Sequence, residues 1–102
     1  MDNEGLNDFS RILDELERLL VRRRWILREL KEFEEKYGMS SEEFYNSWIQ
    51  GEIPEPDDPD MHGDFIVWAG LVEELKKIER EIIERIRGVR TLWTWDRSLE
   101  PA

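Results

Sequence analysis

Apolar residues in the first third of the chain recur at alternating intervals of four and three positions. This period places their side chains on one face of an α-helix. Arg23 is the one charged member, and Gly38 follows the last member, where glycine favours the left-handed conformation that ends helices. The pattern predicts an amphipathic helix over residues 8–37. The members of the repeat are Ile12, Leu16, Leu19, Arg23, Ile26, Leu30, Phe33 and Tyr37.

Local signals predict a short second helix over residues 41–50. Ser40 is a favourable N-cap, and Glu43, three residues later, completes a capping box. Met39 and Phe44 have the spacing of a hydrophobic staple across the same boundary. A glycine follows the predicted last turn, so the second helix forms a tight corner after the first.

The segment from Glu52 to Asp64 contains three prolines, six acids and no basic residue. Proline lacks the N–H that helix interiors and central strands require, so this composition predicts a stiff acidic connector. Beyond it, apolar residues at helical spacing predict a third helix over residues 62–87, ended by Gly88. This stripe comprises Phe65, Trp68, Leu71, Leu75, Ile78, Ile82 and Ile86.

The last residues differ in character from the helices. Valine, threonine and tryptophan are enriched there, and these are strand-forming residue types. Trp93 and Trp95, two positions apart, share a face in an extended strand. The sequence therefore predicts a helical domain over residues 1–88 and an extended C-terminal tail over residues 89–102.

The predicted fold class is all-α, a long helical hairpin with a short corner helix. Each long helix measures about 40 Å, and a ten-residue helix is too short to cover both apolar stripes. An uncovered apolar area of this kind marks an interface, so we expect an oligomer or an obligate complex. Within that seam an arginine can specify register. The predicted oligomer seam consists of Leu16, Leu19, Arg23, Ile26, Leu30, Leu75, Ile78 and Ile82.

Composition excludes several function classes. The 102 residues include 25 acids and 15 bases, and the net charge of −10 repels the phosphates of nucleic acids and of anionic membranes. No cysteine and one histidine are present, which excludes thiolate nucleophiles and disulfides. We predict no catalytic residues, no cofactor and no metal ion. The acidic N-terminus and the lack of a long apolar run predict a cytoplasmic protein without a membrane span.

Two local patterns also admit a functional interpretation. Residues 36–54 have the helix–turn–helix arrangement of some DNA-binding proteins, although the basic surface expected of a DNA reader is lacking there. Asp60, His62 and Asp64 have a spacing that could supply ligands to a metal ion. A capped helix start explains the same residues more simply, because acids are favourable at that position.

Pairs of glutamates three positions apart resemble the magnesium ligands of helical pyrophosphohydrolases. They alternate with basic residues on the expected outer face, and such spacings arise readily in a chain that is a quarter acidic. Because convergent catalytic groups are lacking, the sequence predicts that the protein is not an enzyme. The pairs are Glu29 with Glu32, Glu32 with Glu35, and Glu81 with Glu84.

The candidate partner-binding residues lie in the tail and the connector. Tryptophan and arginine are the residues that most often dominate binding energy at protein interfaces, and an extended tail could also add to the sheet edge of a partner. The acidic connector suits a partner with a basic surface. The predicted partner-binding residues are Trp93, Trp95, Leu92, Arg90, Asp57, Asp58 and Asp60.

The segments KYGMSSEEFYNSW (36–48) and DFIVWAGLVEEL (64–75) resemble a family of small helical proteins from archaea and cyanobacteria. That family has a long helix ending in YGMS, an EEF-type helix, and a D-F-x-E-W-A helix, and its members are often encoded as the antitoxin of two-gene toxin–antitoxin modules. The resemblance covers about residues 30–80. This chain departs from the family in its longer, proline-rich connector and in Val67, where the family has an acid. The residues that carry the resemblance are Tyr37, Gly38, Met39, Ser40, Phe44, Gly51, Asp64, Phe65, Trp68 and Ala69.

The resemblance implies a protein that neutralises a toxin by direct binding. An acidic, non-catalytic helical chain is compatible with a toxin whose active surface is basic, such as a ribonuclease. Two alternatives stay open from the residues alone. One is a structural or scaffolding homodimer held by the apolar stripes, and the other is a helix–turn–helix-like transcriptional regulator.

Overall fold

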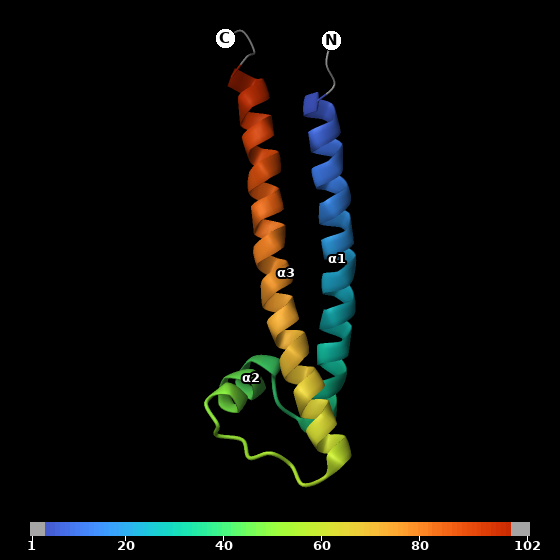
Figure 1. Cartoon of the computed structure of the whole chain (residues 1–102), viewed down its shortest axis with the longest axis vertical. Helices are drawn as coiled ribbons and strands as arrows, with labels where there is room; N and C mark the ends of the chain where they lie inside the picture. The colour runs from blue at the N-terminus through green and yellow to red at the C-terminus, as the bar shows by residue number, and fades with distance from the viewer. Residues whose placement is uncertain (1–3, 99–102) are drawn as a thin grey trace.

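The computed structural model describes residues 4–98, with side chains described over residues 7–92. Three helices follow one another along the chain: α1 (Glu4–Tyr37), α2 (Ser41–Ile49) and α3 (Pro59–Ser98). Helices α1 and α3 run antiparallel as a rod whose longest dimension is 66 Å, and α2 lies against the end where the chain turns (Figure 1). The predicted all-α class and hairpin architecture are confirmed, and no strand occurs within residues 4–98.

The corner between α1 and α2 forms as its residues predict. Gly38 has a φ of 66°, the left-handed conformation, and its N–H donates to the carbonyl of Glu34. The Ser40 hydroxyl accepts a 3.1 Å hydrogen bond from the backbone N–H of Glu43, which confirms the N-cap. These contacts are local in sequence, and for that reason the boundary could be read from a few neighbouring residues.

The predicted end of the third helix at Gly88 is wrong. Helix α3 continues through Gly88 to Ser98, so residues 89–98 are helical where the sequence predicts an extended tail. A glycine inside a helix costs only about 1 kcal/mol, and strand propensity is easily overridden by context. Packing supplies the context here, because a Cβ at Gly88 would lie 3.5 Å from Cδ1 of Ile12 in α1. Residues 99–102 of the predicted tail lie outside the described residues.

The buried core is one cluster, and its aromatic members lie at the end of the rod that α2 covers. The rings of Phe44 and Trp68 stack with centroids 3.9 Å apart and an interplanar angle of 2°. Both side chains are almost fully buried. Rings from all three helices join them, so α2 is held by packing as well as by its cap. The other members are Phe33, Tyr37, Trp48 and Phe65.

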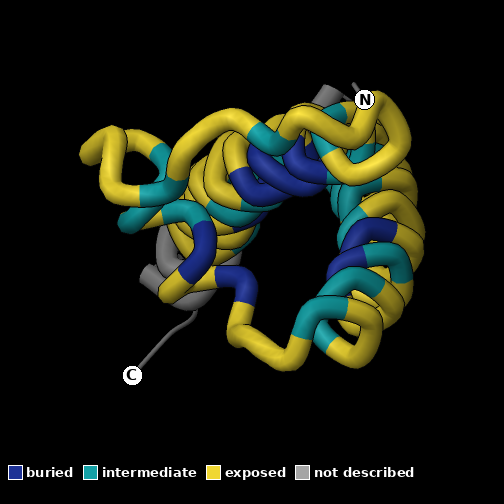
Figure 2. Tube along the Cα trace, turned by 90° about the horizontal axis from the view of Figure 1, so that it is seen from below, coloured by how far each residue is buried: buried dark blue, intermediate teal, exposed yellow. Residues whose placement is uncertain are grey.

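Beyond α2, the rod is a two-helix shaft. Figure 2 shows the buried segments of α1 and α3 turned toward one another and the exposed positions turned outward. Ion pairs join the two helices along the shaft, and the bidentate pair between Arg22 and Glu74 has distances of 2.8 and 3.0 Å. Arg85 with Glu15, and Arg23 with Glu79, are the others. Two helices can bury only one stripe each, so other apolar positions stay exposed.

Candidate functional site

The residues predicted to bind a partner lie near opposite ends of the rod. Asp57 and Asp58 belong to the connector and Asp60 to the first turn of α3, whereas Arg90 and Leu92 belong to its last turns. Because a helix rises 1.5 Å per residue, Asp60 and Arg90 are separated by about 45 Å. The structure therefore does not bring the two groups together into one site.

The C-terminal group gives little support to a docking segment. Arg90 is exposed and Leu92 is half-buried. Trp93 and Trp95 lie in the helical part of α3, so the shared face expected of an extended strand does not follow, and their side chains lie outside the described residues. Because residues up to Ser98 are helical, this segment does not have the extended conformation that pairing with a partner's sheet edge requires.

The connector, residues 50–58, is largely exposed and is anchored at one apolar residue. Ile53 packs against the core cluster, while Asp57 and Asp58 are exposed. Asp58 has a structural role, since its Oδ1 accepts a 3.0 Å hydrogen bond from the N–H of Asp60 at the start of α3. That contact is the cap expected of an acid at this position. Asp57 and Asp60 thus present their carboxylates to solvent beside a fixed backbone.

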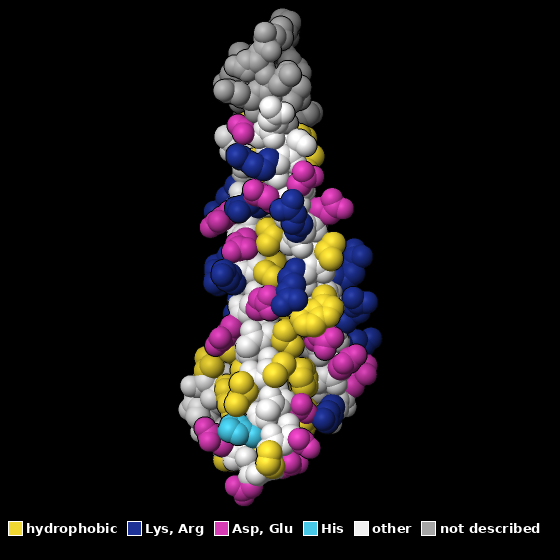
Figure 3. Space-filling model, turned by 45° about the vertical axis from the view of Figure 1, so that its right-hand side comes forward, with side chains coloured by type: hydrophobic (Ala, Val, Ile, Leu, Met, Phe, Trp, Pro, Cys, Tyr) yellow, Lys and Arg dark blue, Asp and Glu magenta, His cyan; other side chains and the backbone are white. Residues whose placement is uncertain are grey.

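Charge is segregated along the rod. Residues 29–75, which form the end with α2 and the connector, contain fourteen acidic and two basic residues, a formal charge of −12. We call this region the acidic end. The shaft, residues 7–28 and 76–92, contains seven acidic and twelve basic residues, a formal charge of +5. Figure 3 shows basic side chains interspersed with acidic ones along the shaft and mainly acidic ones at the lower end.

Only some acids of this end are engaged within the molecule. Asp64 accepts from Lys36 and Tyr37, Glu73 from Tyr45, and the Glu34 carboxylate from the backbone of Ser41. In the described part of the chain, the connector acids form no such contact apart from the Asp58 cap. The exposed remainder consists of Glu32, Glu35, Glu42, Glu43, Glu52, Glu55, Asp57 and Asp60. Sequence reasoning singled out only the connector, although counting charges on both arms of the predicted hairpin would have found the rest.

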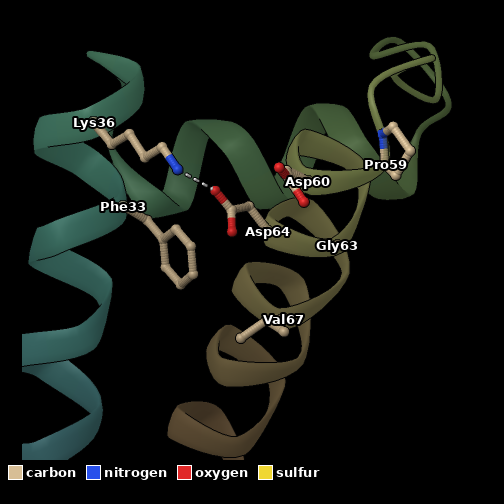
Figure 4. A pocket seen from close by; sticks show the side chains of 7 residues that line it. All are labelled: Phe33, Lys36, Pro59, Asp60, Gly63, Asp64 and Val67. Carbon is tan, nitrogen blue, oxygen red and sulfur yellow. Dashed lines mark hydrogen bonds and ion pairs between the residues drawn. The ribbon is translucent and has the colours of Figure 1, made fainter.

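An open groove at this end is bordered by a compact ion pair. Lys36 Nζ lies 2.7 Å from Asp64 Oδ2, and the Tyr37 hydroxyl donates to the same oxygen at 2.6 Å (Figure 4). The hydrogen bond from Lys36, then that from Tyr37, lowers the pKa of Asp64, and the same contacts raise the pKa values of Lys36 and Tyr37. The groove is lined by Phe33, Lys36, Pro59, Asp60, Gly63, Asp64 and Val67.

This cluster is a clamp that joins α1 to α3. The hydrogen bonds favour the ionised carboxylate of Asp64 and the protonated forms of Lys36 and Tyr37, which are the forms that hold this contact together. Tyr37 and Asp64 both belong to the segments that carry the family resemblance. In this molecule, residues of those segments cap α2 and pack the helices together.

The residues predicted as an oligomer seam pack within the single chain. Ile26, Leu30, Ile78 and Ile82 are buried in the cluster between α1 and α3, and Leu16, Leu19 and Leu75 are partly buried against it. Arg23 pairs with Glu79 of α3 at 3.3 Å. The apolar residues predicted for the seam therefore belong to the core of the hairpin or pack against it.

Two further observations concern the alternative interpretations. His62 is half-buried near the start of α3, and no group of three or more His, Cys, Asp or Glu that could hold a metal ion occurs among the described residues. None of the three helices, as far as they are described, is long and apolar enough to cross a membrane. In the helix–turn–helix interpretation, the first turn of α2 contains Glu42 and Glu43, which disfavour contact with phosphates.

Comparisons of the chain with protein-family models, with curated proteins and with solved structures found no match. Membership of the antitoxin family therefore stays a prediction from the resemblance over residues 36–48 and 64–75.

Proposed function

We propose that this protein is a non-catalytic protein-binding module, and that its acidic end binds a partner protein with a basic surface. The observation that carries the proposal is the formal charge of −12 on residues 29–75, gathered on one end of a rod whose shaft is net positive. Opposite charges across an interface steer the partners together and set their orientation. Negative charge therefore predominates at one end of the molecule and positive charge along the shaft, a separation that the net charge of −10 does not show.

Exposed apolar residues at the same end supply the second requirement of a protein interface, a patch that can be desolvated. Ile49 is 58% exposed and directly precedes the connector, and Val67 is 53% exposed and lines the groove beside Asp60. Met39, Met61 and Ile66 add further exposed apolar area on this end of the chain. A surface with these features suits a partner that offers cationic groups around an apolar centre.

The finer part of the proposal is that the partner is a toxin and that binding neutralises it. This part depends on the resemblance to antitoxins. An acidic surface on a stiff connector would cover a basic active site such as that of a ribonuclease, and the cytoplasm would then be the place of action. Electrostatic attraction would mainly raise the association rate and select the partner.

The test is co-expression with the small protein encoded beside this gene. We expect the chain to co-purify with it and to restore growth of cells that the neighbouring protein inhibits. The triple variant Glu52→Gln, Glu55→Gln, Asp57→Asn should slow association, and raised salt should slow association of the native chain in the same way.

A matched control neutralises the same number of acids on the shaft, with Asp14→Asn, Glu81→Gln and Glu84→Gln. Its association rate should stay near that of the native chain. If both triple variants slow association equally, the acidic end is not the binding surface. If the neighbouring protein neither binds nor inhibits growth, the antitoxin assignment fails.

A further inference from the structure

Three leucines on α1 form a second apolar stripe beside the one that packs on α3. Leu13, Leu20 and Leu27 are spaced seven residues apart and are 43%, 48% and 38% exposed. Heptad spacing keeps residues on one face of a helix over this length, about 21 Å. The stripe is therefore a continuous exposed row.

Helix α3 contributes to the same face of the shaft. Arg23, one turn after Leu20, pairs across the shaft with Glu79, and Glu79 lies one turn before Ile83. The ion pair thus marks the side of the hairpin on which both rows lie. Ile83 and Ile86 are 49% and 52% exposed. We call the surface formed by Leu13, Leu20, Leu27, Ile83 and Ile86 the Leu–Ile face.

Helix α2 covers the lower continuation of this face. Lys76 of α3 lies 4.3 Å from the ring centroid of Tyr45 in α2, and the Tyr45 hydroxyl donates to Glu73. Ile83 lies seven residues beyond Lys76, at the equivalent position on the helix. Helix α2 therefore covers α3 on this side at the acidic end, whereas Ile83 and Ile86 farther along α3 stay exposed.

We infer that the Leu–Ile face binds a second copy of this chain, arranged antiparallel with Leu20 on the two-fold axis. A two-fold interface is self-complementary, so each residue must face a suitable residue of the other copy. About an axis at Leu20, Leu13 faces Leu27 of the second copy and Leu27 faces Leu13. The two hairpins would then form a four-helix bundle, with one α2 helix at each end.

Charge beside the leucines fits this register. Each of Glu17 and Arg24 lies one turn after a leucine of the stripe, and both are exposed. Antiparallel pairing about Leu20 places Glu17 of one copy near Arg24 of the other, and the symmetry creates this opposite-charge contact twice. Flanking charges of this kind set partner choice and orientation in helix bundles. A parallel register would instead bring Glu17 beside Glu17.

This surface differs from the one proposed for the partner protein. The Leu–Ile face lies on the shaft, whereas the connector acids lie at the acidic end. A dimer of this kind leaves both acidic ends outward, about a rod length apart, and it would therefore present two partner-binding surfaces. The inference does not depend on the antitoxin proposal.

The experiment measures the solution mass of the full chain by light scattering and by sedimentation over two decades of concentration, since dimerisation follows mass action. The native chain should approach twice its 12.4 kDa mass as the concentration rises. Leu20→Glu should keep it at one chain, because two buried glutamates would meet at the axis. Val21→Glu is the matched control, since Val21 is 61% exposed and does not belong to the Leu–Ile face.

Two further variants test the register itself. Glu17→Arg should weaken the dimer, and Glu17→Arg combined with Arg24→Glu should restore it, because both contacts are inverted together. Since the chain has no cysteine, Leu20→Cys gives a single thiol on the axis. An added two-electron oxidant should couple the thiols of two chains into a disulfide, with release of two protons, whereas Val21→Cys should not be linked. Circular dichroism confirms that each variant stays helical.

The proposal is overturned if the native chain stays monomeric at every concentration. It is equally overturned if Leu20→Glu and Val21→Glu dimerise alike, which would place the contact elsewhere. A dimer that Leu20→Glu disrupts, but in which the double charge inversion restores nothing, would reject the antiparallel register. Binding of an acidic helix of another protein to the monomer would assign the face to a different occupant.

Discussion

The indole N–H of Trp68 donates a 2.9 Å hydrogen bond to the hydroxyl oxygen of Ser41, and the side chains of both residues are buried. The backbone N–H of Ser41 in turn donates to the carboxylate of Glu34. One serine at the first position of α2 therefore connects all three helices. This polar contact satisfies the indole within the aromatic cluster, where an unpaired N–H would be costly.

Replacing Ser41 with alanine should lower the free energy of unfolding by about 1–3 kcal/mol, because the Trp68 N–H would stay buried without an acceptor. Denaturant titration followed by tryptophan fluorescence measures this change. Ser47→Ala, in the same helix, is the control, since the Ser47 hydroxyl makes no hydrogen bond within the described residues. If both variants lose the same free energy of unfolding, the hydrogen bond from Trp68 to Ser41 does not contribute the expected stability.

Phe44→Ala should destabilise the protein by about 3–5 kcal/mol, the range for removing a large buried aromatic ring. Phe44 is 1% exposed and stacks on Trp68, so its loss leaves a cavity where α2 meets the hairpin. Thermal unfolding measures the change. Trp25→Ala should cost far less, because Trp25 is 37% exposed, and a similar loss in both variants would contradict a core centred on the α2 contact.

Two glycine substitutions should have opposite signs. Gly38 has a φ of 66°, and alanine in the left-handed region costs roughly 1–2 kcal/mol. Gly70 lies within α3, and an added Cβ there meets no atom within 4 Å, so Gly70→Ala should stabilise the helix by about 1 kcal/mol. Chemical denaturation of both variants tests the corner and the helix together, and a stabilising Gly38→Ala would refute the left-handed corner.

Gly88→Ala tests the continuity of α3. In an unbroken helix the alanine should raise stability by up to about 1 kcal/mol, because its Cβ would make an ordinary contact 3.5 Å from Ile12. If a left-handed glycine ended the helix at this point, the same substitution would destabilise the protein. Circular dichroism and the midpoint of thermal unfolding distinguish the two cases.

The clamp between Asp64, Lys36 and Tyr37 should make stability depend on pH at both extremes. The pKa of Asp64 is lowered from 3.8 by the hydrogen bond from Lys36, so its contribution is present above 3.8 and is lost as the pH falls through the folded-state pKa. The pKa values of Lys36 and Tyr37 are raised, so their contributions are complete below 10.5 and 10.0 and decline as the pH rises further.

The variant Asp64→Asn removes the acceptor charge of this clamp. It should be less stable than the native chain near neutral pH, and the two stabilities should converge in acid. Unfolding measured from acid to alkaline pH gives the difference curve. Glu42→Gln, an exposed acid without a contact in the described residues, is the control and should leave the profile unchanged. If the free energy of unfolding of Asp64→Asn differs from that of the native chain by the same amount at every pH, the charge of Asp64 is not what stabilises the clamp.

The candidate site was only partly predictable from the sequence. The connector acids could be identified because they lie close together in the sequence, and Asp57 and Asp60 are exposed. Their combination with Glu32, Glu35, Glu42 and Glu43 depends on how the hairpin folds back. The continuous α3 places Trp93 and Trp95 near the end of the rod opposite to the connector acids, so the predicted partner-binding residues do not form one site.

The sequence by itself determined the all-α class, the amphipathic α1 and the corner at Gly38 and Ser40, because periodicity and capping act between residues a few positions apart. Only the tertiary structure decided where the apolar stripes find their partners and where α3 ends. Leu16 and Ile78 pack within one chain, Gly88 stays helical against Ile12, and Leu20 is left exposed. These outcomes depend on contacts between residues far apart in the sequence, such as Arg22 with Glu74 and Arg85 with Glu15, which no local pattern encodes.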